Sequence, residues 1–248
     1  MKGIATSALF AGAAAVLFAS AAQATVVLQN GESVNLGWLM NQSQDRQVII
    51  DDKLFTFESF GANGFRANDF RVVGFIGAGS HGNGLNNVGF DITGPFGDTT
   101  PGADGMNEMN IQYSVEVLPE FYERGVRLCD TRLTFNGSSG GIGSFARVDE
   151  TILDLDFNNY LGTLAAYDTF GPPQDRKLYD AIDFCDTYGT SGYRAFEVNK
   201  DLKFFAATEN GFSSASWVRQ EFSQVYVPGP GSLALLALAG VGARRRRA

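Results

Sequence analysis

The sequence contains very little histidine and cysteine. Its 248 residues include one histidine, His81, and two cysteines. A multi-histidine metal centre is therefore excluded, as are a four-cysteine zinc site and an iron–sulfur cluster. Any histidine-dependent triad or dyad would have to use His81, which lies in the glycine-rich stretch 77–84. Neighbouring glycines support a catalytic base poorly, so we expect His81 to be an exposed loop residue.

The N-terminal segment has almost no charge. Residues 1–24 carry a single charged side chain, Lys2, followed by an apolar stretch and then Ala22-Gln23-Ala24. A charged start, an apolar run and small residues at the cleavage site are typical of a secretory signal peptide. We predict a short signal helix that signal peptidase removes after Ala24, with Ala22 and Ala24 at the recognised positions. A buried N-terminal helix is the weaker alternative, because no polar residues give the run an amphipathic face.

The C-terminal segment, residues 227–248, contains no acidic residue. It begins with Val227, Pro228, Gly229 and Pro230, continues as a Leu/Ala-rich segment, and ends with Arg244, Arg245, Arg246 and Arg247 before a final alanine. The prolines stop a preceding strand, and the arginines would hold an apolar helix at the cytoplasmic side of a membrane. The 14 residues from Pro230 to Ala243 would span about 21 Å of a hydrocarbon core of about 30 Å, which is short for a permanent anchor.

This order of a Pro-x-Pro turn, a short hydrophobic helix and an arginine tail resembles the PEP-CTERM sorting signal of exported bacterial proteins. The chain matches at Pro228, Pro230 and the arginines, and it departs at Gly229, where glutamate is usual. The resemblance implies transient retention in the inner membrane, cleavage near the prolines by an exosortase-type enzyme, and release to the cell surface or extracellular matrix. The stretch Asp52 to Phe60 is similar to the start of the β-rich body of many such proteins, a body without assigned activity.

Residues 25–226 form an acidic body. Without Lys2 and the terminal arginines, 14 of the 19 basic residues remain beside all 27 acidic ones, so the formal charge is −13 rather than −8. A surface of this sign repels nucleic acid and anionic lipid. We therefore expect no nucleic-acid partner.

The two cysteines, Cys129 and Cys185, both lie in this body. Export would bring them into an oxidising compartment, where a pair of thiols normally closes, so we predict a structural disulfide. A redox-active pair is the alternative, but the spacing is unlike Cys-x-x-Cys.

The body reads as short strands separated by glycine-rich turns. From Asn110 to Leu118, apolar and polar residues alternate strictly, which is typical of a half-buried strand. We expect further strands at 53–60, 70–76, 88–92, 125–135, 145–155, 193–198, 202–208 and 212–218. The sequence has no repeat with a period of 20 to 50 residues, which disfavours a solenoid or a propeller. The pattern predicts an all-β chain folded as a single β-sandwich or jelly-roll domain.

Four short stretches carry sharper expectations. Asn210-Gly211 is typical of a tight hairpin turn with positive φ between the last two strands. The glycine-rich stretch 136–143 should be a flexible connection, because it suits neither helix nor strand. The stretches 33–42 and 175–182 could each form a short helix.

Acidic residues are the candidates for cation or acid–base chemistry. Glu150, Asp154 and Asp156 would share one strand face, which we interpret as a solvated face. The stretch 94–105 could supply Asp98 and Asp104 as calcium ligands in an extracellular setting, or it could be a plain surface loop. No EF-hand spacing is present.

Aromatic residues are the candidates for carbohydrate binding, since rings flanked by polar groups stack on sugar faces. Tyr160 and Tyr188 lie in turn-like sequence and are expected to be exposed. Trp38 and Trp217 lie among apolar neighbours, so we expect both in the core.

Together these features predict an exported, non-enzymatic surface or matrix protein with no cofactor other than a candidate calcium ion. One alternative is a carbohydrate- or calcium-binding module of the exopolysaccharide matrix. Another is a hydrolase that uses a carboxylate pair, which would require two opposed carboxyl groups across a cleft. The sequence does not show such opposition.

Overall fold

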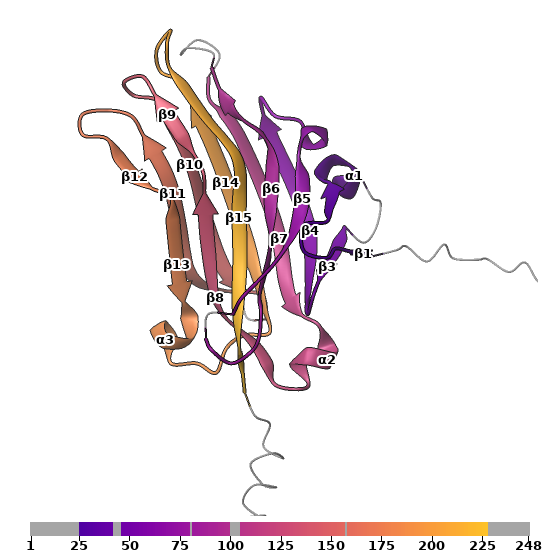
Figure 1. Ribbon diagram of the computed structural model, residues 1–248. Helices are drawn as coiled ribbons and strands as arrows, with labels where there is room; N and C mark the ends of the chain where they lie inside the picture. The colour runs from indigo at the N-terminus through magenta and orange to yellow at the C-terminus, as the bar shows by residue number, and fades with distance from the viewer. Residues whose placement is uncertain (1–24, 42–45, 80, 100–104, 157, 228–248) are drawn as a thin grey trace, which may run out of the picture.

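The computed structural model describes residues 25–41, 46–79, 81–99, 105–156 and 158–227. These residues form two β-sheets that pack face to face, so the predicted all-β sandwich is confirmed (Figure 1). The helices predicted for the two terminal segments lie outside the described residues. Within the described part, no helix has the length and apolar character needed to cross a membrane.

The first sheet has eight strands. In spatial order they are β1 (Val26–Val27), β3 (Gln47–Ile50), β4 (Lys53–Asn63), β7 (Asn107–Val117), β14 (Ala195–Phe205), β10 (Phe145–Asp154), β11 (Asn159–Thr169) and β12 (Asp175–Lys177). The β1–β3 pair is parallel and the other pairs are antiparallel. The predicted strands 193–198 and 202–208 are one continuous strand, β14.

The second sheet has seven strands with β15 near its centre. In spatial order they are β13 (Tyr179–Asp183), β8 (Val126–Phe135), β15 (Phe212–Tyr226), β6 (Asn87–Asp98), β5 (Arg71–Gly77) and β2 (Ser33–Asn35), with β9 (Ser138–Gly140) also beside β15. The short helices α1 (Leu36–Met40), η1 (Ala67–Asp69), α2 (Pro119–Tyr122) and α3 (Phe184–Tyr188) lie at the rims of the sandwich.

The core lies between the sheets and is rich in phenylalanine. Phe55 and Phe57 of β4 are fully buried, and their rings lie 5.3 and 5.4 Å from that of Phe90 of β6 on the opposite sheet. Phe96 and Phe204 stack at 5.7 Å near the other end of the core. Burial of each such ring contributes roughly 2 kcal/mol, so the alternating apolar positions hold the sheets together.

The predicted Asn210-Gly211 hairpin is wrong. Strand β14 belongs to the first sheet and β15 to the second, so the turn between them crosses from one layer to the other. Neither Asn210 nor Gly211 has a positive φ, and the Gly211 N–H donates to the carbonyl of Thr208 at 2.7 Å. The layer that a strand joins depends on core packing, which the turn residues do not encode.

Two other local predictions are also wrong. The stretch 175–182 forms strand residues in β12 and β13 instead of a helix. The stretch 136–143 contains β9, which pairs with the start of β15, so it is not simply a connection. In both places edge pairing with an existing strand satisfies the backbone groups, and this outweighs the weak local preference.

The predicted disulfide is confirmed. Cys129 of β8 and Cys185 of α3 are bonded, with Cα atoms 5.3 Å apart. Cys129 coincides with a register shift between β8 and β15. The bond fastens α3, which follows edge strand β13, to an inner strand of the second sheet.

Candidate binding site

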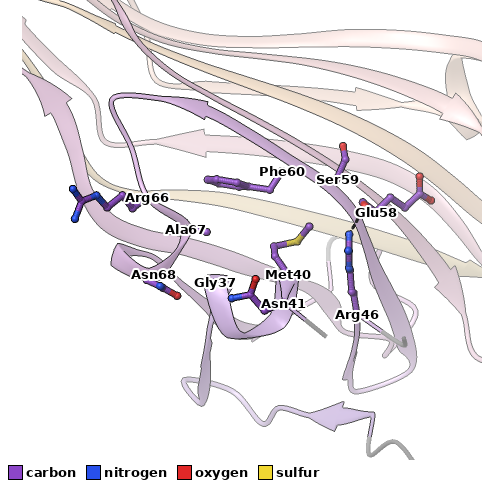
Figure 2. A pocket seen from close by; sticks show the side chains of 10 residues that line it. All are labelled: Gly37, Met40, Asn41, Arg46, Glu58, Ser59, Phe60, Arg66, Ala67 and Asn68. Atoms are coloured by element: carbon purple, nitrogen blue, oxygen red, sulfur yellow. Dashed lines mark hydrogen bonds between the residues drawn. The ribbon is translucent and has the colours of Figure 1, made fainter. Parts of the chain in front are cut away.

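A pocket of about 610 Å³ opens between α1, η1 and the outer part of β4 (Figure 2). Phe60 and Met40 supply apolar lining, and both are partly buried against the core. Arg46 and Arg66 lie toward opposite ends of the lining, with the apolar side chains between them. The pocket therefore combines an apolar centre with charged and polar ends.

The pocket exists because β3 and β4 pair over only part of their length. Their pairing ends at Gln47 and Thr56, and the register of β4 against β7 shifts between Phe57 and Ser59. Such a shift is a bulge that bends the strand and leaves Glu58 without a directly opposite residue. The outer part of β4 is therefore open on one side.

Helix α1 is held at the opening by its N-cap, Asn35. The Asn35 side chain accepts the backbone N–H of Trp38 at 2.9 Å and donates to the carbonyl of Asn68 at 2.7 Å. Gly37 permits the close approach of α1 to η1, because a Cβ there would lie 1.9 Å from Oδ1 of Asn68. These contacts fix one wall of the pocket.

Charge in the pocket is mixed. The Arg46 guanidinium donates from Nη1 to the backbone carbonyl of Glu58 at 2.7 Å (Figure 2). Burial raises the pKa of Glu58, and the nearby Glu197 carboxylate raises it further. Among the described residues that line the pocket, Glu58 is the sole carboxylate beside two guanidinium groups. Within a body of strongly negative charge, this site can accept an anion.

Both tryptophan predictions are wrong. Trp38 is 48% exposed, because Leu36 and Leu39 take the inward positions of α1. Trp217 is half-buried on the outer face of β15, where the guanidinium of Arg219 lies 5.6 Å from its ring centroid. Trp38 thus presents an aromatic ring on the helix that forms the pocket wall.

Tyr160 is on β11 and Tyr188 on α3, elements that lie on the opposite side of the sandwich from α1 (Figure 1). They are 61% and 48% exposed, respectively, as expected. The Tyr188 hydroxyl donates to the carbonyl of Leu161, so α3 reaches the strand that carries Tyr160. The Tyr188 ring stacks on Phe184 with centroids 6.5 Å apart. The structure therefore brings these two predicted residues to the same region.

The predicted acidic sites are placed differently from the expectation. Residues 94–98 are part of β6, and Asp98 is buried and accepts the N–H of Ala206 at 2.9 Å. Asp104 lies outside the described residues, so no calcium geometry can be built from this pair. The solvated face proposed for β10 is wrong, because Glu150 and Asp154 are buried and only Asp156 is exposed. The inward face of β10 is the one that was expected to face solvent: Val148, Glu150 and Ile152 point inward.

His81 lies in a loop, but its side chain is only 24% exposed. Its Nε2 lies 3.4 Å from the Asp130 carboxylate. Ligand atoms of His81, Cys129 and Asp183 gather within 4.8 Å. Cys129 is in the disulfide and offers no thiolate, so this cluster is not a metal site while the bond is formed.

The terminal sorting and cleavage residues fall mostly outside the described part. Val227 is the last described residue, and its N–H donates to the carbonyl of Gly125 at 2.7 Å. Ala22 and Ala24 lie outside the described residues, as do Pro228, Gly229, Pro230 and Arg244 to Arg247.

The pocket residues Arg46, Glu58, Phe60 and Arg66 were not predicted as a site. They come from separate segments that meet only when α1 and η1 close over β4. No spacing in the sequence marks such a meeting. The nearest local signal is Asn35 before an apolar stretch, which is typical of a helix N-cap.

The fold places the protein among two-sheet β-sandwiches. No family model matches the sequence, and no curated protein matches it. Among solved structures, a mannan-recognising carbohydrate-binding module, TmCBM27, is 12% identical with a TM-score of 0.26, covering 77% of this chain and 95% of that one. A cellulase derived from Cel12A of Rhodothermus marinus is 8% identical with a TM-score of 0.20, covering 71% and 100%. Endoglucanase 3 of Trichoderma harzianum, from family GH12, is also 8% identical with a TM-score of 0.20, covering 70% and 97%. Similarities at this level assign no function to the chain.

Proposed function

We propose that this chain is an exported, non-enzymatic protein of the bacterial cell surface or extracellular matrix. The observation that carries the proposal is the ordered pair of end segments around a β-rich body, since the C-terminal segment resembles a PEP-CTERM signal. The Cys129–Cys185 disulfide supports export, because such bonds persist in oxidising compartments. Signal peptidase and an exosortase-type enzyme are the processing partners, and contact with the inner membrane is transient.

Processing at the two ends gives the first prediction. In a host with the sorting enzyme, the released protein should begin at Thr25 and lack the arginine tail, as measured by intact mass and N-terminal sequencing. Replacing Pro228 and Pro230 with alanine should leave the tail attached in the membrane fraction. Gly229→Glu, which restores the usual residue of the family pattern, is the matched control and should be processed at least as fully as the unaltered chain. Identical mass and location with and without the enzyme would rule out this route.

We further propose that the pocket at α1, η1 and β4 binds an acidic saccharide of the exopolysaccharide matrix. Guanidinium groups pair with carboxylates through two parallel hydrogen bonds, and Arg66 lies at one end of the lining, opposite Arg46 (Figure 2). Asn41 and Asn68 offer amides to sugar hydroxyls, and the apolar centre can pack against a sugar ring.

The same lining favours binding over hydrolysis. Glycoside hydrolysis ordinarily uses two carboxyl groups that face each other across the scissile bond. Glu58 is the single carboxylate among the described lining residues. Glu197 is the other carboxylate near Glu58, and it is not among the described lining residues.

A binding experiment tests the pocket. Arg66→Ala should weaken binding of an acidic polysaccharide by about tenfold, because one charge-assisted contact is lost. Arg176→Ala is the matched control, since Arg176 is exposed on β12 at the far edge of the same sheet. Calorimetric titration with an acidic and a neutral polysaccharide provides the measurement.

The tyrosine pair provides the competing outcome. If binding survives Arg66→Ala and Trp38→Ala but is lost in Tyr160→Ala or Tyr188→Ala, the saccharide site is at β11 and α3 instead of the pocket. If the unaltered protein binds neither polysaccharide, the saccharide proposal is wrong, while the export proposal stands on its own test.

A further inference from the structure

A lysine is fully buried at the centre of the sandwich. Lys200 of β14 has no exposed surface, although the rest of its inward face, Val198 and Leu202, is apolar. Glu150 lies directly opposite on β10, and its carboxylate contacts Nζ of Lys200. From the other sheet, Gln220 of β15 presents Oε1 at 2.9 Å from the same Nζ. The amine therefore lies between a carboxyl group and a carboxamide.

The surroundings favour a neutral amine. Glu150 and Gln220 are also buried, and Gln220 has the core residues Phe90 and Leu133 as its cross-strand neighbours. Burial lowers the pKa of Lys200 well below its ordinary value, because the ammonium form loses its hydration. Among the described residues, Oε2 of Glu150 has no hydrogen-bond partner, which is costly for an ionised carboxylate. Complete burial and the unpartnered Oε2 of Glu150 therefore favour a neutral amine beside a neutral carboxylic acid over an ion pair.

We propose that Lys200 and Gln220 form an intramolecular isopeptide bond that covalently joins the two sheets. The lone pair of Nζ attacks Cδ of Gln220, the Nζ–Cδ bond forms, the Cδ–Nε2 bond breaks, and Nε2 leaves as ammonia. One oxygen of the protonated Glu150 carboxyl group accepts the proton that Nζ loses, while the other oxygen gives its own proton to the departing Nε2, so Glu150 ends in the protonation state in which it began. Amine and carboxamide give a secondary amide and ammonia, so the reaction needs no oxidant or co-reactant.

The leaving group is also positioned. Nε2 of Gln220 donates to the hydroxyl of Thr131 on β8 at 2.5 Å, which orients the carboxamide and keeps Oε1 toward the lysine. Thr131 is fully buried, so bulk water does not compete for these groups. Nζ contacts Oε1, so Cδ, the carbon that it attacks, lies one bond further away. Holding an uncharged nucleophile this close to its target in a dry site is an arrangement that accelerates a slow reaction.

A second lysine–glutamine pair, whose glutamine also lies on β15, provides an internal comparison. Lys53 of β4 lies 2.6 Å from Oε1 of Gln224, and its Nζ contacts the Asp52 carboxylate at 2.9 Å. Burial lowers the pKa of Lys53, but Asp52, Asp51 and Asp130 all act in the opposite direction. The ammonium is better supported here, so we expect this pair to remain hydrogen-bonded.

Peptide mapping of the full chain, unfolded and reduced, tests the bond. The expected product is a branched peptide that joins the segments containing Lys200 and Gln220, with a mass one ammonia below the sum of the two. Glu150→Gln keeps the side-chain shape but cannot relay the proton, so it should yield two linear peptides. Asp149→Asn is the matched control: this neighbouring carboxylate points outward and pairs with Arg147, so the branched peptide should remain.

Three results would overturn the proposal or a part of it. Lys200 and Gln220 in separate linear peptides, from a chain whose circular dichroism shows the folded β-sandwich, would exclude the bond. A branched peptide at Lys53 and Gln224 alone would show that the wrong pair was assigned. A branched peptide that persists in Glu150→Gln would remove Glu150 from the reaction. The first two results come from the unaltered chain, so they do not depend on a variant that folds.

Discussion

Replacing Lys200 with methionine is expected to lower the free energy of unfolding by about 3–5 kcal/mol, because two buried groups each lose a hydrogen-bond partner at a cost of about 1–3 kcal/mol. The change leaves the buried Glu150 carboxyl group without its partner and removes the donor to Gln220 Oε1. An unpaired ionisable group cannot be hydrated at this depth, so the unfolded state becomes relatively more favourable. Urea unfolding followed by circular dichroism measures the difference. Loss of the proposed isopeptide bond would act in the same direction.

Two further variants distinguish the effect of burial on the free energy of unfolding from the effect of losing a lysine charge. Lys203→Met lies on the same strand, but Lys203 is partly exposed and pairs with Asp201 at the surface, so its effect should stay below about 0.5 kcal/mol. The double variant Lys200→Met with Glu150→Leu should recover part of the loss, because no orphaned carboxyl group remains. If Lys200→Met costs no more than Lys203→Met, the buried cluster does not contribute to stability.

Replacing both Cys129 and Cys185 with alanine is expected to lower the free energy of unfolding by about 4 kcal/mol and Tm by roughly 10 °C. The cysteines are separated by 56 positions, so the bond closes a long loop in the unfolded chain and reduces its conformational entropy. The bond also fastens α3 to β8, and α3 carries Tyr188. The double change avoids a free thiol. Thermal unfolding followed by circular dichroism is the measurement.

Reduction is the control for this prediction. A thiol reductant should shift the Tm of the unaltered protein toward that of the double variant, and it should leave the double variant unchanged. Equal Tm values for the oxidised protein and the double variant would show that the bond does not limit unfolding.

The strands that could be read from the sequence have strong local alternation. The stretch from Asn110 to Leu118 was predicted almost to its ends and corresponds to β7. Strand β11 was missed because its inward positions include the small residues Gly162 and Ala166, which give a weak strand signal. Gly162 is small for a tertiary reason: a Cβ there would lie 2.7 Å from Ile182 of the other sheet. Packing between the two sheets therefore requires small residues in β11, and these residues weaken the strand pattern in the sequence.

The choice of the inward face of β10 also could not be made from the sequence, and this choice decides whether Glu150 is buried. Val148, Glu150 and Ile152 alternate with Asp149, Thr151 and Leu153, so the sequence offers two faces that each mix polar and apolar residues. A carboxyl group is normally assigned to solvent, and this rule selected the wrong face. The inward face became acceptable for Glu150 only because Lys200 lies opposite it on a strand that follows much later in the chain.

The sequence by itself determined the features that depend on composition and near neighbours: the all-β class, the pairing of the only two cysteines, and the two distinctive end segments. The tertiary structure decided which polar residues could be buried and where a pocket would open. Burial of Lys200, Glu150 and Gln220 requires partners from three strands in two sheets. The pocket requires α1 and η1 to close over an unpaired part of β4. Side chains distant in sequence can form hydrogen bonds with one another, or line a common pocket, only after the sheets have packed. No local pattern therefore contains this information.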